Sequence, residues 1–401
     1  MLHGRRILLV IAGGIAAYKS LELIRRLREH GAVVRCVMTA AAQRFITPLA
    51  AQTLSGERVY SDLFSLTDES EMGHLRLSQE ADLIVIAPAT ADLIAKLAVG
   101  LADDLASTVL IASDKPILLA PAMNTRMWIN PATQANVARL EKRGVKRVGP
   151  EAGALAEAET GIGRMAEPNA IADAVEAIFV AQATLRGRKA LVTSGPTEEA
   201  IDPVRYIANR SSGKQGHAIA AALARLGADT VLVAGPTREA DPPGVRVVHV
   251  RSAREMLAAC EAQLPVDVAV CAAAVADWRV DAAPQKLKKT DALPVLKLVE
   301  NPDVLATLAQ AGNRRPRLVV GFAAETENLV AAARAKRAKK GCDWILANDV
   351  STASGVFGGD VNEIHLIDER RTESWGRLSK RDVGDRLAAR IGQFFERKAA
   401  E

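Results

Sequence analysis

Three short segments carry residue types that can bind or transform a small anionic molecule. Residues 87–92 (APATAD) end an apolar run and offer a hydroxyl and backbone N–H groups where a helix should begin, which suits a phosphate. Residues 121–128 (PAMNTRMW) place an amide and two thioethers directly after a second apolar run. His74 lies upstream of both, and imidazole titrates near neutral pH. Taken singly, these segments also fit a capped turn, a methionine-rich core and a surface histidine.

Two lysine-rich segments lie in the second half of the chain. Residues 286–289 (KLKK) stand between loop-forming sequences, and residues 334–340 (RAKRAKK) have helical spacing that places Lys336 and Lys340 on one face. A solvated helix face, a site for an anionic small molecule and nucleic-acid binding all fit the second segment. The net charge of +5 permits nucleic acid, but aromatic residues make up only 3% of the chain, and single strands need aromatic stacking platforms.

Neither glycine-containing loop matches an ordinary nucleotide fingerprint. Gly13 and Gly14 follow the first apolar run, but Ala16 and Ala17 occupy the later positions of a G-x-G-x-x-G pattern. Gly213 is followed by Lys-Gln and lacks the spacing and hydroxyl of a phosphate-binding P-loop. A nicotinamide oxidoreductase, which would suit glycine turns in a doubly wound sheet, is therefore the weaker of the enzyme classes.

Alternating strands and helices should position these segments. Strands are predicted over residues 5–12, 33–39, 82–87, 116–120, 189–194, 230–234, 245–250, 267–272, 317–320 and 343–346, and helices over 15–30, 171–184, 213–226 and 253–263. This order predicts an α/β fold of two doubly wound, Rossmann-like domains with mostly parallel sheets, which bind ligands outside the carboxyl ends of their strands. The polar sequence RGR at 186–188 places the boundary near residue 187.

Composition excludes several classes of protein. With 401 residues, 49% of them hydrophobic and 25% charged, the chain can fill two or three cores, which argues against disorder, collagen and a disulfide miniprotein. No apolar stretch reaches the roughly 18 residues of a membrane span. The basic and apolar N-terminus resembles a signal peptide, yet it continues into a glycine loop and a helix. The four cysteines fit neither a zinc nor a disulfide spacing, so a cytoplasmic location is expected.

The chain resembles two enzyme families in succession. Residues 13–19 (GGIAAYK), 72–74 (MGH), 87–92, 121–128 and 161–165 (GIGRM) are similar to the flavin-dependent phosphopantothenoylcysteine decarboxylases. Residues 193–206, 209–214 (NRSSGK), 272–278, 286–289, 321–326 and 347–350 resemble the phosphopantothenate–cysteine ligases. Fused in this order, the halves resemble the bacterial bifunctional enzymes of coenzyme A biosynthesis. The resemblance implies a flavodoxin-like flavoprotein domain over 1–187 and a ligase domain over 188–401.

For the first domain, the resemblance implies FMN and the decarboxylation of 4'-phosphopantothenoylcysteine to 4'-phosphopantetheine. A flavin suits this reaction because an N-acylcysteine carboxylate has no electron sink until the thiol-bearing carbon is oxidised. His74 matches the general base and Asn124 the residue that binds the substrate carboxylate. Cofactor contacts are expected from Gly14, Thr39, Pro88, Thr90, Ala91 and Ser107, and substrate contacts from Met123, Arg164, Met165 and, in the second domain, Arg205.

For the second domain, the resemblance implies ligation of cysteine to 4'-phosphopantothenate with CTP and Mg²⁺. The carboxylate must first be activated, and the family does this by forming an acyl-cytidylate. Lys286 matches the mobile lysine over the triphosphate, and Asn209 matches the asparagine that positions the acyl-cytidylate. Further CTP contacts are expected from Ala272, Ala273, Asp277, Pro302, Asp303, Phe322, Lys336 and Lys340. Metal ligands stay unassigned. A homo-oligomer is implied, with neither nucleic acid nor membrane as a partner.

One position departs from the family pattern. Where the decarboxylases usually carry Ala-Cys-Gly, with the cysteine as proton donor, residues 155–161 read LAEAETG and place Glu157 at the cysteine. Glu157 either donates the proton in its place or is a solvated residue of an acidic stretch. The substitution also leaves open a noncatalytic flavoprotein as the first domain.

Overall fold

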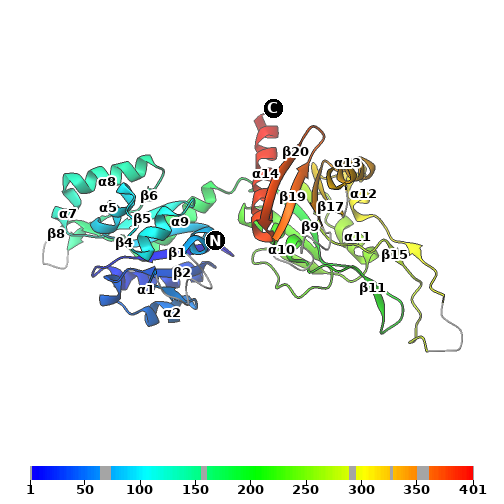
Figure 1. Cartoon of the computed structure of the whole chain (residues 1–401), viewed down its shortest axis with the longest axis horizontal. Helices are drawn as coiled ribbons and strands as arrows, with labels where there is room; N and C mark the ends of the chain where they lie inside the picture. Colours follow the sequence, from blue (N-terminus) through cyan, green and yellow to red (C-terminus); the bar gives the residue numbers. More distant parts are fainter. Residues whose placement is uncertain are drawn as a thin grey trace. The chain divides into compact units, whose positions relative to one another are not determined.

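The computed structural model describes residues 2–63, 74–154, 160–288, 295–325, 328–349 and 361–400. The chain divides into two compact units, Met1–Ala181 and Gln182–Glu401 (Figure 1). Among the helices in these ranges, none is both long enough and apolar enough to span a membrane.

The first unit is built on a six-stranded parallel sheet with the order β3-β2-β1-β4-β5-β6. This is the strand order of the Rossmann fold and differs from the flavodoxin order 2-1-3-4-5. Its elements are β1 (Arg6–Ile11), α1 (Ala17–Glu29), β2 (Val33–Met38), η1 (Ala42–Arg44), α2 (Pro48–Ser55), β3 (Val59–Tyr60), α4 (His74–Glu80), β4 (Leu83–Ala89), α5 (Ala91–Val99), α6 (Leu105–Ile111), β5 (Ile117–Pro121), α7 (Thr125–Ile129), α8 (Pro131–Lys142), β6 (Lys146–Arg147), β7 (Glu151–Ala154), β8 (Thr160–Arg164) and α9 (Pro168–Ala181).

Alternation along the buried strands builds a core on each face of this sheet. Leu9 and Ile11 of β1 face α1 and α9, whereas Leu8 and Val10 face the layer that contains α5, α6 and α8. Because both faces are covered, the strands are apolar at nearly every position, as the sequence predicted for parallel strands. β7 and β8 form a separate antiparallel hairpin.

The second unit has an eight-stranded sheet with the order β13-β12-β9-β14-β17-β18-β19-β20, antiparallel only at β18-β19-β20. Its elements are β9 (Lys189–Ser194), β10 (Glu198–Ala200), β11 (Tyr206–Ala208), α10 (Lys214–Arg225), β12 (Asp229–Ala234), β13 (Arg246–His249), α11 (Ala253–Glu261), β14 (Val268–Cys271), β15 (Trp278–Arg279), β16 (Val299–Glu300), α12 (Val304–Ala309), η2 (Gly312–Arg314), β17 (Leu318–Glu325), α13 (Leu329–Lys340), β18 (Trp344–Asp349), β19 (Val361–Ile367), β20 (Thr372–Ser379) and α14 (Lys380–Ala400). Helices α10 and α14 pack side by side (Figure 1), and α11 and α12 contribute to a second core.

The division between the units lies a few residues before the position near residue 187 that the sequence suggested. Leu185 is fully buried in the core of the second unit, and its N–H donates to the carbonyl of Leu226 at 2.9 Å. The polar sequence that follows Leu185 is therefore a turn inside the second unit.

Candidate functional sites in the two units

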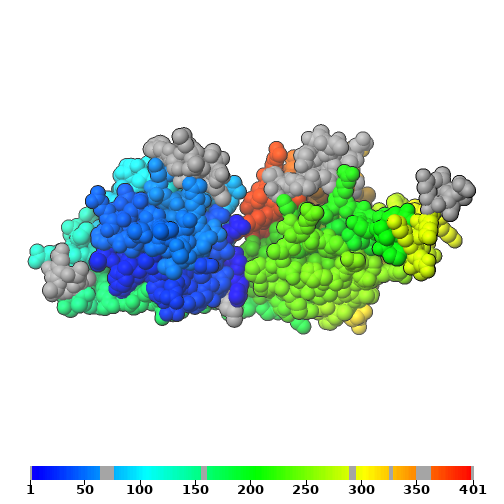
Figure 2. Space-filling view, turned by 90° about the horizontal axis from the view of Figure 1, so that it is seen from below, coloured from blue at the N-terminus to red at the C-terminus, as the bar shows by residue number. Residues whose placement is uncertain are grey.

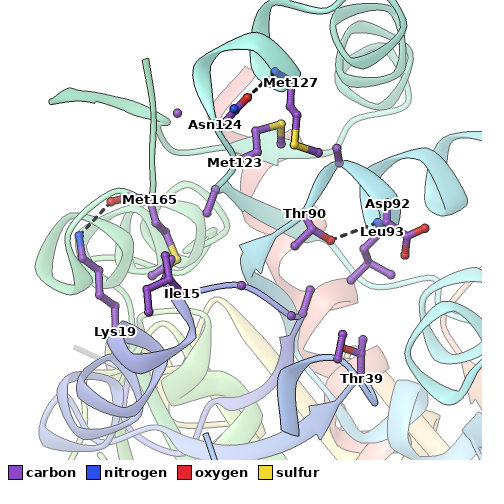
Figure 3. Close-up of a pocket in the computed structure, with 18 of the residues that line it drawn as sticks. Ile15, Lys19, Thr39, Thr90, Asp92, Leu93, Met123, Asn124, Met127 and Met165 are labelled. Atoms are coloured by element: carbon purple, nitrogen blue, oxygen red, sulfur yellow. Dashed lines mark hydrogen bonds between the residues drawn. The ribbon is translucent and has the colours of Figure 1, made fainter. Parts of the chain in front are cut away.

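A cavity of about 850 Å³ opens at the carboxyl ends of β1, β2, β4 and β5 in the first unit (Figure 3). Parallel doubly wound sheets bind their ligands at this edge. The cavity brings together eight predicted cofactor or substrate residues from distant parts of the sequence: Gly14, Thr39, Thr90, Ala91, Met123, Asn124, Arg164 and Met165.

Helix caps hold two polar side chains at the rim of this cavity. The hydroxyl of Thr90 accepts from the N–H of Leu93 at 3.4 Å and begins α5, and Oδ1 of Asn124 accepts from the N–H of Met127 at 2.9 Å and begins α7 (Figure 3). Because the oxygen end of the Asn124 amide is bound by the cap, its NH₂ end is the part left to donate. An amide donor suits a carboxylate ligand.

The two adjacent glycines of the first loop have different reasons to be glycine. A Cβ at Gly13 would lie 2.3 Å from the Cβ of Ala41, so packing against the next connection excludes a side chain there. A Cβ at Gly14 would meet nothing within 4 Å, and Gly14 lines the cavity. The space beside Gly14 is therefore part of the binding volume.

Lys19 is a cavity residue that the sequence analysis did not single out. Its ammonium group donates to the carbonyl of Met165 at 3.2 Å (Figure 3). It also donates to Glu167 at 2.8 Å, and the Lys19 side chain is only 8% exposed. The guanidinium of Arg164 donates to the same carboxylate at 2.5 Å. The hydrogen bond from Lys19, followed by that from Arg164, holds the pKa of Glu167 below its usual value. These contacts connect the end of β8 to α1. The only sequence signal for them is the position of Lys19 shortly after the glycine loop.

Four predicted residues of the first unit do not contribute described side chains to the cavity. Pro88 does not line it, and Ser107 is buried, with its hydroxyl and N–H bound to Asp104 in a capping box that begins α6. Asp104 lines the cavity instead. His74 is the first residue of α4, but its side chain lies outside the described part of the structure, as does the whole of Glu157.

A second cavity, of about 610 Å³, lies in the second unit at the carboxyl ends of β14, β17 and β18. Residues 209–213 and Gly216 at the start of α10 form one wall, and residues 272–275 after β14 form another. The predicted residues that line this cavity are Asn209, Ala272, Ala273, Asp277, Phe322 and Lys336. The amide Nδ2 of Asn209 donates to the carbonyl of Val275 at 3.0 Å and so links the two walls.

The remaining predicted residues of the ligase domain lie outside the lining of this cavity. Lys340 forms an ion pair with Asp303, which also caps α12 by accepting from Ala306 N–H at 2.9 Å. Lys286 is exposed, and Arg205 is paired with Asp202. Pro302 precedes the α12 cap and is not in the lining either. Three predicted cations thus have no place in the cavity in this conformation.

The described ranges supply neither a preformed cluster of metal ligands nor a cysteine of lowered pKa. They contain no cluster of three or more His, Cys, Asp or Glu residues that could hold a metal ion. Burial raises the pKa of the thiols of Cys36 and Cys260 to about 12 and that of Cys342 to about 11, so these groups are thiols rather than nucleophilic thiolates at neutral pH.

Each of the two units matches a different protein-family model. The family model described as "Flavoprotein" matches residues 1–180, and the model described as "DNA/pantothenate metabolism flavoprotein C-terminal domain" matches residues 185–394. The chain therefore belongs to the DNA/pantothenate metabolism flavoproteins, with an N-terminal flavoprotein domain.

Relatives that match almost the whole chain define its family more closely than the two family models do. The chain is 48% identical over 370 residues to the coenzyme A biosynthesis bifunctional protein CoaBC of Vibrio parahaemolyticus, covering 91% of this chain and 92% of the relative. It is 43% identical over 398 residues to the CoaBC protein of Haemophilus influenzae, covering 99% of each. A crystal structure of the C-terminal domain of a CoaBC protein matches with 34% identity and a TM-score of 0.44, covering 53% of this chain and 98% of that one.

The predicted function is confirmed at this level: the chain is a bifunctional enzyme of coenzyme A biosynthesis, with a phosphopantothenoylcysteine decarboxylase and a phosphopantothenate–cysteine ligase activity. Its substrates are small molecules. The class of nicotinamide oxidoreductase, considered from the sequence, is thereby excluded.

Proposed function

We propose that the 850 Å³ cavity of the first unit binds FMN together with 4'-phosphopantothenoylcysteine. The observation that carries this assignment is the convergence of the open space at Gly14, the Thr39 and Thr90 hydroxyls and the Asn124 amide at one sheet edge. A volume of about 850 Å³ is within the range of sites that enclose a cofactor-sized ligand. A bound flavin supplies a reversible hydride acceptor for the thiol-bearing carbon.

The residues of the chain orient the substrate around this chemistry. The Asn124 NH₂ group donates to the carboxylate that is lost, and the Met123 and Met165 side chains provide an apolar surround. Arg164, at the cavity lining, suits a further anionic group of the substrate. His74 acts as the general base, and Glu157 returns a proton after CO₂ has left. The role of His74 rests on the family pattern, and that of Glu157 rests on its position where the family carries the proton-donating cysteine.

In the second unit we propose that the 610 Å³ cavity forms the acyl-cytidylate from CTP and 4'-phosphopantothenate. Asn209 stands between two walls of the cavity and can contact an intermediate that spans them. Lys336 lines the cavity and suits the negative charge of the nucleotide. Mg²⁺ would enter with the triphosphate, since magnesium usually keeps several waters and binds substrate phosphates. Lys286 would approach the triphosphate from outside the cavity.

A homo-oligomer is part of the same proposal. Exposed apolar side chains line the first cavity: Ile15 is 62% exposed, Tyr18 59% and Met127 48%. Ile129, 60% exposed, lies in the same helix as Met127. Groups of exposed apolar residues commonly mark protein interfaces. A second copy of the chain would cover them, in line with the oligomer that the family resemblance implies.

One reaction mixture tests the proposed function. Full-length protein supplied with 4'-phosphopantothenate, CTP, Mg²⁺ and cysteine should release CMP, pyrophosphate and CO₂ and form 4'-phosphopantetheine, identified by mass. Accumulation of 4'-phosphopantothenoylcysteine without loss of CO₂ would show that the first unit is a noncatalytic flavoprotein. Consumption of ATP with no consumption of CTP would overturn the nucleotide assignment.

A further inference from the structure

A buried carboxylate outside both cavities holds the segment that carries Lys286. Oδ1 of Asp202 accepts from the N–H groups of Val204 and Arg205 at 2.8 and 2.9 Å. Oδ2 accepts from Nε and Nη2 of Arg205 at 3.0 and 2.6 Å and from the N–H of Leu287 at 3.1 Å. The Asp202 side chain is completely buried, so this ionised group depends on its five donors. The hydrogen bond from Arg205 is the main reason that the pKa of Asp202 lies far below its usual value.

The same pair binds both polar backbone groups of Leu287. While Asp202 accepts from the Leu287 N–H, Nη2 of Arg205 donates to the Leu287 carbonyl at 2.9 Å. The N–H of Ala283, three residues before Lys286, also donates to the carbonyl of Ile201 at 2.9 Å. Leu287 directly follows Lys286, so the backbone on both sides of this lysine is fixed to the turn at residues 201–205. Figure 2 shows the green and yellow segments that contain these residues at the surface of the second unit.

We propose, on the basis of the ligase function above, that Asp202 and Arg205 are positioning residues that place Lys286 for acyl-cytidylate formation by holding Leu287. Arg205 then acts through this contact instead of binding a substrate anion. Its Nε and Nη2 donors are committed to Asp202 and Leu287, so the contacts to Leu287 and Asp202 together take up three of the five N–H donors of the guanidinium.

The turn also connects Lys286 to the other proposed ligase residue. Strand β11 begins at Tyr206, directly after Arg205, and ends at Ala208, directly before Asn209. Three extended residues span about 10 Å, and β11 is paired with β10. One short hairpin therefore fixes both the Asn209 side of the cavity and the anchor of the lysine segment.

A double-mutant cycle in the full-length protein tests this inference. Asp202→Asn keeps the size of the side chain but can place an NH₂ group against the Arg205 and Leu287 donors. It should slow CTP-dependent pyrophosphate release by about the factor lost in Lys286→Ala, roughly a hundredfold. The double variant should be no slower than Lys286→Ala alone, because both changes remove the same contribution. The KM for 4'-phosphopantothenate should stay near that of the wild type.

Two further variants separate positioning from substrate binding and from misfolding. Arg205→Lys keeps the charge but loses the paired contacts to Asp202 and Leu287, so it should behave like Asp202→Asn. Asp281→Asn, a matched change at an exposed position of the same connection, should leave ligation unchanged. A far-UV circular dichroism spectrum like that of the wild type in every variant would report a folded unit.

Several results would overturn the inference. A raised KM for 4'-phosphopantothenate in Arg205→Lys, with an unchanged rate at saturation, would make Arg205 a substrate contact. If the rate losses of Asp202→Asn and Lys286→Ala multiply in the double variant, the contact between Asp202 and Leu287 does not act through Lys286. Ligation at the wild-type rate by Asp202→Asn would show the same. Wild-type protein that consumes no CTP would contradict the proposed ligase chemistry instead.

Discussion

Gly163 offers a sharp test of how the first cavity is built. It lies in β8, and its carbonyl accepts from the N–H of Met123 at 3.0 Å. A Cβ added at Gly163 would lie 2.1 Å from the Met123 carbonyl oxygen and 3.3 Å from the carbonyl carbon of Asn124. Both neighbours are backbone atoms, so no side-chain rotation can relieve the contact. Gly163→Ala therefore requires β8 to move away from the segment that carries Asn124.

The size of that movement follows from the contact. Ordinary Cβ contacts begin above 3.0 Å, so the two backbones must separate by about 1 Å. A misplacement of this size costs roughly a hundredfold in rate when it disturbs the alignment of reacting groups. We expect Gly163→Ala to lower the rate of CO₂ release from supplied 4'-phosphopantothenoylcysteine by about that factor. Flavin content should fall as well, because Gly163 lines the cavity. CTP-dependent ligation is proposed for the other unit and should be unchanged.

Gly153 in the partner strand β7 provides a matched control. The two glycines have nearly the same φ, 157° and 158°, so an alanine meets the same backbone strain at either position. At Gly153, however, the nearest atom to an added Cβ is the Nη1 of Arg164 at 3.2 Å, the end of a flexible side chain. Gly153→Ala should keep most of the decarboxylase activity. Equal losses in the two variants, or full activity in Gly163→Ala, would refute the role given to the close approach of β8.

Three other expectations concern Glu157, His217 and Leu185. Glu157→Gln should release CO₂ once per active site without forming 4'-phosphopantetheine, since general acid catalysis is worth about a hundred- to ten-thousandfold in rate. Glu157→Cys should restore turnover. Normal turnover in Glu157→Gln would show that Glu157 is only a solvated residue. Burial lowers the pKa of His217, so the unfolded chain binds the proton more readily and the stability of the second unit should decline below about pH 6.5. The urea midpoint of His217→Phe should decline less than that of the wild type as the pH is lowered. An equal decline of the two midpoints with pH would contradict this expectation. A fragment beginning at Gln182 keeps the buried Leu185, whereas a fragment beginning at Arg188 lacks it and the roughly 2 to 5 kcal/mol that such a side chain contributes to stability. The longer fragment should therefore unfold at a higher urea concentration. Equal urea midpoints would contradict the assignment of Leu185 to the core of the second unit.

The sequence predicted the parallel strands well because burial on both faces leaves a continuous apolar signal. Strand β4, for example, is buried at every position from Leu83 to Ala89. The order of the strands in the sheet has no comparable local signal. It depends on whether each connection returns to one side of the preceding strand or to the other. The β10–β11 hairpin also escaped prediction: each strand has three residues, and the turn between them is held by the buried carboxylate of Asp202.

The predicted site residues that the structure gathers in one cavity include several that directly follow a strand. Thr90 and Asn124 lie at strand ends, and the parallel sheet brings all such ends to one edge. Ser107 shows the opposite case, since a serine at the third position of a helix can bind the capping residue as readily as a ligand. From the sequence alone, the two uses of its hydroxyl cannot be told apart.

The residues that sequence reasoning missed share a chemical feature. Lys19 binds the backbone carbonyl of Met165, and Asp202 binds the backbone N–H of Leu287. Each is a buried charged side chain that holds main-chain atoms next to a residue proposed to touch a ligand. Motif reasoning searches for groups that react, whereas these groups fix the loops on which reactive groups are carried. Because a buried charge without its partners is costly, such residues tie the position of a loop to the stability of its unit. In both units, the precision of the proposed chemistry thus depends on buried charged groups that hold the backbone beside the proposed ligand contacts.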